Sequence, residues 1–123
     1  MATDHWRVKL DVPAATRYLH IVRLTTAGAA AEAGLDAEEV EDIKIAVDEL
    51  CSVAIAASTD DQVLSLQFIA TDDGLQVEAT VPTSDAMEVD EMGQAIISAT
   101  VDAFTWDVGD PGGFHLAKSH RGR

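Results

Sequence analysis

Cysteine, basic residues and long apolar runs are scarce in this chain, and each shortage excludes something. The 123 residues contain one cysteine, Cys51, so no disulfide can form within the chain, and a reducing, cytoplasmic compartment is expected. No apolar stretch approaches the roughly 20 residues that a membrane-spanning helix needs. The opening residues, MATDHWRVKL, contain no apolar core like that of a secretory signal. The sequence therefore predicts a soluble, cytoplasmic protein.

Basic side chains are also few. Eight lysines and arginines stand against 22 acidic residues, which gives a formal net charge of −14. Such a surface repels phosphates, which argues against sequence-independent binding of nucleic acid and against docking on anionic membranes. The acidic surface either keeps the protein soluble or meets a basic partner protein. The four histidines lack the spacing of metal ligands, so no metal site is predicted; they are His5, His20, His115 and His120.

The apolar pattern predicts one domain over residues 1–123, since 47% of the residues are apolar and no linker or repeat interrupts them. The expected elements are a strand at 5–12, helices at 14–34 and 36–57, strands at 63–69 and 75–81, a helix at 92–104, and strands at 105–108 and 114–117. Helices on one face of a mostly antiparallel sheet would make a two-layer α+β sandwich. The polar residues 119–123 are expected to be loose.

The second expected helix has the clearest signals. Asp36 and Glu39 have the spacing of a capping box, and Ser58 ends the helix. Its apolar residues recur with a period of 3.6, which predicts that they pack on the sheet: Ile43, Ala46, Val47, Leu50, Ala54 and Ala57. Cys51 is expected to be an inert thiol in the core. Trp6 and Trp106, on the first and penultimate strands, are also expected in the core.

Turn residues set the hairpins. Thr71-Asp72-Asp73-Gly74 between two apolar runs predicts one hairpin, and residues 110–113, Asp-Pro-Gly-Gly, predict another.

Three segments carry a resemblance to a known family. The run Ala46-Val47-Asp48-Glu49 matches the start of a nucleotide-binding helix motif, residues 93–97 followed by Val101-Asp102 resemble a later conserved helix, and residues 113–118 resemble a last strand. In this order and spacing they resemble the RsbW-like anti-sigma factors, a branch of the histidine-kinase-type ATPase fold. The likeness is nearest to the anti-sigma-F proteins of actinobacteria.

The resemblance implies a regulator of transcription in stress responses that binds a sigma factor or its anti-anti-sigma antagonist, commonly as a homodimer. It places Arg23 where the family presents an arginine to these partners. Arg17, His20 and Arg23 recur every third residue, so they form a basic strip that we expect to bind the partner through the first helix and the sheet edge. The alternative for Arg23 is a surface arginine whose stem packs on the core.

Members of the family that use ATP phosphorylate a serine of the antagonist, with the glutamate at position 49 as general base. By this resemblance, Gly93 would cradle a phosphate at a helix N-terminus. The alternatives are a solvated carboxylate at Glu49 and an ordinary loop-to-helix junction at Gly93.

The chain departs from the family at the nucleotide site. Val53 stands where the family has a Mg²⁺-binding asparagine, and a valine offers no oxygen to a metal that accepts little else. Residues 81–85, Val-Pro-Thr-Ser-Asp, replace the adenine-binding Asp-x-Gly-x-Gly, and the lid between 82 and 92 is short. The sequence therefore predicts a regulatory binding protein without catalysis or cofactor. The alternatives are an ATP- and Mg²⁺-dependent protein serine kinase, with Glu49 catalytic, and a sensor domain for another ligand.

Overall fold

The computed structural model describes residues 5–82, 88–109 and 111–121. The predicted order of elements is confirmed, with a short 3-10 helix before the first α-helix. The elements are β1 (Trp6–Pro13), η1 (Thr16–Tyr18), α1 (Leu19–Glu32), α2 (Ala37–Ala56), β2 (Val63–Ala70), β3 (Gly74–Val81), α3 (Glu91–Thr100), β4 (Ala103–Asp107) and β5 (Gly112–Ser119).

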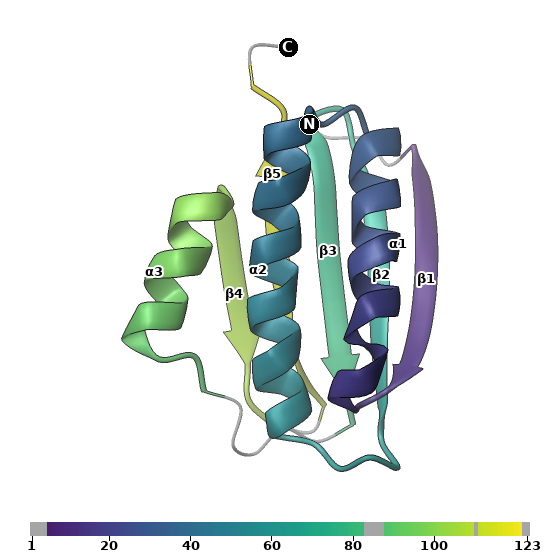
Figure 1. Ribbon diagram of the computed structural model, residues 1–123, viewed down its shortest axis with the longest axis vertical. Coiled ribbons are helices and arrows are strands. Elements are labelled where there is room, and N and C mark those ends of the chain that lie inside the picture. The colour runs from purple at the N-terminus through teal and green to yellow at the C-terminus, as the bar shows by residue number, and fades with distance from the viewer. Residues whose placement is uncertain (1–4, 83–87, 110, 122–123) are drawn as a thin grey trace.

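The strands form one sheet in the order β1-β2-β3-β5-β4, and every neighbouring pair is antiparallel. The three helices cover one face of this sheet, so the predicted two-layer α+β sandwich is confirmed (Figure 1). The hairpin between β2 and β3 forms as predicted, with Thr71 and Gly74 exchanging backbone hydrogen bonds. Gly74 has φ +152°, and a Cβ there would lie 2.2 Å from the carbonyl oxygen of Lys118, so only glycine fits.

The helix α2 lies at the centre of the helical layer and packs on the sheet through the predicted apolar face. The Asp36 side chain accepts from the Glu39 amide at 2.8 Å and the Glu39 side chain accepts from the Asp36 amide at 2.8 Å, which confirms the capping box. Leu50 is fully buried and belongs to the same hydrophobic core as Phe68. Cys51 is fully buried too, and this burial raises the pKa of its thiol, so an inert core cysteine is the right description.

Two predicted helix boundaries are wrong. The first helix begins at Leu19 rather than at 14, because Ala15 is extended, with φ −141° and ψ 143°, and η1 intervenes. The third ends at Thr100 rather than at 104, because Val101 is extended and Phe104 pairs with Leu116 in the sheet. Val101 and Phe104 have helical spacing in the sequence, but pairing of β4 with β5 ends the helix before them.

The two tryptophans are half-buried rather than fully in the core. Trp6 packs on the core from the edge strand β1. Trp106 stacks on Phe104 with ring centroids 5.9 Å apart. Both lie on outer strands of the sheet, where the helices give less cover.

The polar C-terminal segment is ordered as far as Arg121, contrary to prediction. The His120 amide donates to the Asp73 carbonyl at 3.0 Å, and Arg121 bonds to α2. Parts of other predictions lie outside the described residues: positions 83–87 of the acidic connection and altered adenine box, Asp110 of the second turn, the last two residues and the first four. In the described chain, no helix combines the length and apolarity needed to cross a membrane.

Candidate functional site

The junction of α2 and α3 brings two of the predicted nucleotide-site residues together. A Cβ added to Gly93, in the first turn of α3, would lie 3.5 Å from Glu49 Oε2 and 3.1 Å from Val89 Cγ1. The carboxylate of α2 therefore rests against the start of α3. Glu49 is half-buried and Gly93 is buried, so little space separates the two helices here.

The start of α3 already holds an anion of its own chain. The Gly93 amide donates to Asp90 Oδ1 at 2.7 Å, which is an N-cap hydrogen bond. Glu91 adds a second carboxylate in the first turn, and Glu49 a third beside it. A phosphate would have to displace the cap and enter a cluster of like charges, although a helix N-terminus favours anions in general.

Val53 lies one turn beyond Glu49 on α2. Its side chain is half-buried and packs against the apolar core. No oxygen at this position can bind Mg²⁺. Four surface hollows are lined by described residues, and those four include neither Glu49 nor Val53 nor Gly93.

The predicted basic strip forms on the surface of η1 and α1, with all three side chains exposed. Arg17 lies over the ring of Tyr18, 4.9 Å from its centroid, and reaches Asp60 at 3.9 Å. The His20 Nδ1 is 2.9 Å from the Arg17 carbonyl oxygen. These contacts are local and leave the strip open to a partner.

Arg23 makes a contact that the sequence did not predict. Its Nε donates to Asp48 Oδ1 at 2.7 Å, which joins α1 to α2, and this hydrogen bond and charge raise the pKa of Arg23. Both side chains are partly exposed, 49% for Arg23 and 36% for Asp48. The two residues are 25 positions apart, so no local pattern links them. Within the described chain, the terminal nitrogens of Arg23 have no further partner, so a second carboxylate can still bind there.

A hollow of about 180 Å³ surrounds this ion pair between α1 and α2. Its other lining residues are Glu41, Lys44 and Ile45. Lys44 pairs with Glu41 at 3.3 Å, and Ile45 is 46% exposed. An exposed apolar side chain rimmed by charges of both signs is the pattern of a protein-binding surface.

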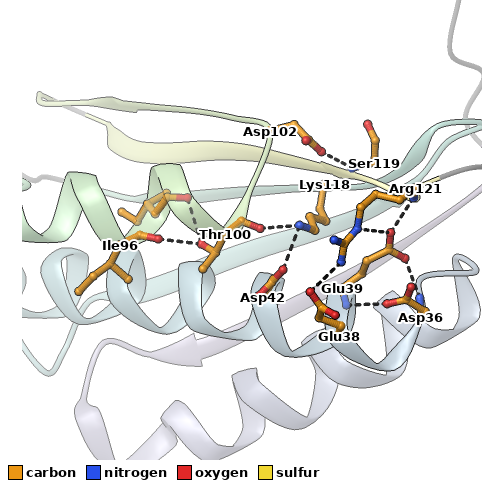
Figure 2. Close-up of polar contacts among 11 residues, drawn as sticks. Asp36, Glu38, Glu39, Asp42, Ile96, Thr100, Asp102, Lys118, Ser119 and Arg121 are labelled. Carbon is orange, nitrogen blue, oxygen red and sulfur yellow. Dashed lines mark hydrogen bonds and ion pairs between the residues drawn. The ribbon is translucent and has the colours of Figure 1, made fainter.

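A polar network joins the C-terminal segment to α2 and to the end of α3, and the sequence did not reveal it (Figure 2). Lys118 of β5 is buried, and its Nζ donates to the Thr100 carbonyl at 2.7 Å and to Asp42 Oδ2 at 3.2 Å. This one cation therefore holds the C-terminal end of α3 and the first half of α2 to the sheet.

Glu39 is the second centre of the network. It is fully buried, and its Oε2 accepts from the Arg121 amide at 2.6 Å and lies 3.4 Å from the Arg121 Nε. The Arg121 pKa is raised, first by the hydrogen bond to Glu38, which is 3.1 Å away. The capping-box pattern identified Glu39 but not its burial, because Arg121 is 82 positions distant.

A five-stranded antiparallel sheet covered on one face, with a capped central helix carrying Glu49, defines the class of the protein. The chain belongs to the histidine kinase-like ATPase domain family, whose model matches residues 12–116. This confirms the predicted fold.

Its relatives within this family include RsbW proteins, as the sequence predicted. The chain is 32% identical to "Serine-protein kinase RsbW" of Bacillus velezensis over 109 residues, which cover 83% of this chain and 68% of that one. It is 34% identical to the protein of the same name from Bacillus subtilis over 102 residues, 77% of this chain and 63% of that one. For the Listeria monocytogenes serotype 4a protein of this name, the match is 32% over 83 residues and spans 65% of this chain and 53% of that one. The matches therefore span from about half to two thirds of these relatives.

A solved structure shows the same fold. The RsbU and RsbW domains of Rv1364c from Mycobacterium tuberculosis match with a TM-score of 0.70 at 20% identity, over 94% of this chain and 32% of that chain. At this identity the likeness supports the fold alone.

Proposed function

We propose that this protein is an RsbW-like regulator that binds a sigma factor or its anti-anti-sigma antagonist without catalysing a reaction. The α2–α3 junction carries this proposal. There the Gly93 amide is bonded to Asp90, and Val53 packs on the core where the family resemblance calls for a Mg²⁺ ligand. The junction therefore offers neither a free helix N-terminus for a phosphate nor an oxygen ligand at position 53 for its metal ion.

The surface formed by α1 and α2 supports the binding half of the proposal. Arg23 is held by Asp48 through Nε, which orients its guanidinium without using its terminal nitrogens. A guanidinium held in this way can bind a partner's carboxylate with little further loss of side-chain freedom. Ile45 offers an apolar contact beside it.

The second candidate is an ATP-dependent serine kinase, and two observations favour it. The RsbW relatives are named serine-protein kinases. Glu49 is half-buried beside α3, where a carboxylate could take the proton of a serine hydroxyl as that oxygen attacks the terminal phosphorus of ATP and ADP leaves.

The decisive experiment starts with an unbiased pull-down from the native host, which identifies the partner. The recovered partner is then incubated with the chain and Mg-ATP, and its serines are analysed by mass spectrometry. We expect a stable complex and no added phosphate. Phosphoserine that appears with the wild-type chain and disappears with Glu49→Gln would establish the kinase instead.

We also propose that the protein acts as a homodimer, as the family resemblance implies.

A further inference from the structure

The strand β4 is one of the two edges of the sheet, at the end of the order β1-β2-β3-β5-β4. An edge strand presents unpaired backbone groups, which natural proteins block with lysine, proline or a covering element. The sequence of β4, Ala-Phe-Thr-Trp-Asp, contains neither lysine nor proline. Within the part of the chain that the structure describes, β4 pairs with β5 alone. Its outer side is therefore available to another strand.

One row of backbone groups in β4 points to this open side. The His120 amide donates to the Asp73 carbonyl at 3.0 Å, in register with the β3–β5 ladder. Because bonding direction alternates along a strand, even-numbered residues of β5 bond to β3 and odd-numbered ones bond to β4. The odd-numbered residues of β5 pair with positions 103, 105 and 107. The amides and carbonyls of Phe104 and Trp106 therefore point away from β5.

The helix-covered face of β4 is apolar. The residues of β5 that pair with Phe104 and Trp106 are both buried, so the two aromatic side chains lie on this face. They are half-buried and stack with ring centroids 5.9 Å apart. The neighbouring helix α3 has no charged residue from Met92 to Thr100, and it lies beside β4 (Figure 1). An added strand would find apolar partners on this face.

The opposite face of β4 carries acidic side chains near both ends of the strand. Asp107 is exposed at its end, and Asp102 is exposed just before its start. Asp102 Oδ2 accepts from the Ser119 amide at 2.6 Å. A hollow of about 280 Å³ behind Asp107 is also lined by the half-buried carboxylate of Glu78 and by His115. The excess of carboxylates favours a partner with basic side chains on this face.

We propose that an extended segment of a partner protein adds to β4 as an antiparallel strand with the pattern base, apolar, any residue, apolar, base. Its apolar residues lie opposite Trp106 and Phe104 and exchange backbone hydrogen bonds with them. One base lies opposite Asp107, and the other lies opposite Ala103, next to Asp102. The antiparallel direction continues the pattern of the whole sheet.

The charges of β4 favour a basic partner over a second copy of this chain. If β4 paired with itself about Thr105, Asp107 of each copy would lie opposite Ala103 and beside Asp102 of the other. Like charges so close are destabilising, and the net charge of −14 adds to the repulsion. None of the residues around Arg23 takes part, so this inference goes beyond the proposed function and does not depend on it.

Amide NMR of the isotope-labelled full chain tests the proposal with the synthetic peptide acetyl-Ser-Arg-Val-Thr-Val-Arg-Ser-amide. We expect saturable shifts centred on β4, with a dissociation constant below about 1 mM. Methyl groups on both valine nitrogens remove the donors that face β4 and should weaken binding about tenfold or more, whereas a methyl group on the threonine nitrogen should change it less than about threefold. Serine in place of both valines removes the apolar contacts and should also weaken binding about tenfold or more.

A matched pair of protein variants tests the charges. Asp107→Asn should weaken peptide binding about threefold or more, because the arginine opposite it loses its carboxylate. Glu32→Gln removes the same charge at an exposed position at the end of α1, away from β4, and should leave binding unchanged.

The results that would overturn the proposal are separate for each part of it. No saturable shift up to about 1 mM peptide, or shifts centred away from β4, would overturn the site. Equal effects of the two kinds of N-methylation would overturn strand addition at Phe104 and Trp106. Equal weakening by Asp107→Asn and Glu32→Gln would reduce the effect to net charge. Shifts of β4 amides that depend on protein concentration without peptide would show a second copy at this edge and overturn the basic partner.

Discussion

Single residues define what the α1–α2 surface and the α2–α3 junction can do. Arg23 is oriented by Asp48, and Glu49 rests against α3 one residue further along α2. Adjacent positions of one helix thus face different neighbours, because successive residues are about 100° apart around the axis. Asp48 lies at the proposed partner surface, and Glu49 lies at the junction.

Replacing Arg23 by alanine tests the partner surface. Asp48 holds the guanidinium through Nε, which leaves its terminal nitrogens as donors for a partner. Loss of this side chain should therefore weaken binding of the recovered sigma factor or antagonist about tenfold or more. Isothermal titration calorimetry measures the change, with a thermal melt to confirm folding. Arg17→Ala removes the same charge at a position with only a 3.9 Å ion pair and should matter less. A loss below about threefold for Arg23→Ala would place the interface elsewhere.

Cys51 gives a prediction about pH. Burial raises the pKa of this thiol in the folded protein above its unfolded value of about 8.5. The neutral thiol therefore contributes stability that is fully present below that pH and is lost as pH rises above it. Iodoacetamide at pH 8.5 should label Cys51 only in denaturant, and Cys51→Val should lose less stability than wild type between pH 8 and 10. Rapid labelling of the folded chain would show that the thiol is accessible.

Among the elements, α2 makes contacts with the most distant parts of the chain. It packs on the sheet through its apolar face, and residues in its first half accept hydrogen bonds from Lys118 and Arg121. One helix therefore connects the core, the C-terminal segment and both candidate surfaces.

Leu50→Ala measures the packing of α2. The side chain is fully buried, so its truncation should cost about 2–5 kcal/mol of unfolding free energy, measured by urea denaturation. Met92→Ala on α3, where the side chain is 71% exposed, should change stability by about 0.5 kcal/mol or less. Equal costs for the two variants would contradict the assigned core.

Lys118→Met measures the network that holds α3. The methionine keeps an apolar stem but leaves the Thr100 carbonyl and Asp42 without their donor, at a cost of about 1–3 kcal/mol. Hydrogen exchange in the last turn of α3 should accelerate as well. Lys44→Met removes a lysine from a more exposed pair with Glu41 and should cost less than about 1 kcal/mol. Unchanged exchange in α3 would show that Lys118 does not hold the helix.

The sequence predicted what local signals encode. Asp36 with Glu39 and the spacing from Ile43 to Ala54 were sufficient for α2, because a cap and a periodic face act within one helix. The end of α3 was predicted wrongly, since only the pairing of Phe104 with Leu116 shows that β4 has begun. The partners of Arg23, Glu39 and Asp42 are 25, 82 and 76 positions away and become neighbours only in the folded chain.

At the scale of the whole molecule, the proposed partner surface and the junction that carries Glu49 lie on different sides of α2. Arg23 and Asp48 line the hollow between α1 and α2, whereas Glu49 rests against the start of α3. The three helices follow one another across the same face of the sheet (Figure 1). The proposed partner surface and the junction are therefore separate regions of the molecule.

The central claim is that this member of an ATPase family works as a binding protein without nucleotide. Titration calorimetry of the full chain with Mg-ATP tests it most directly. The account predicts no saturable binding, or a dissociation constant weaker than about 10 μM, since Val53 supplies no metal ligand and Asp90 occupies the start of α3. Saturable binding tighter than about 10 μM, which corresponds to roughly −7 kcal/mol, would contradict the claim and favour the kinase.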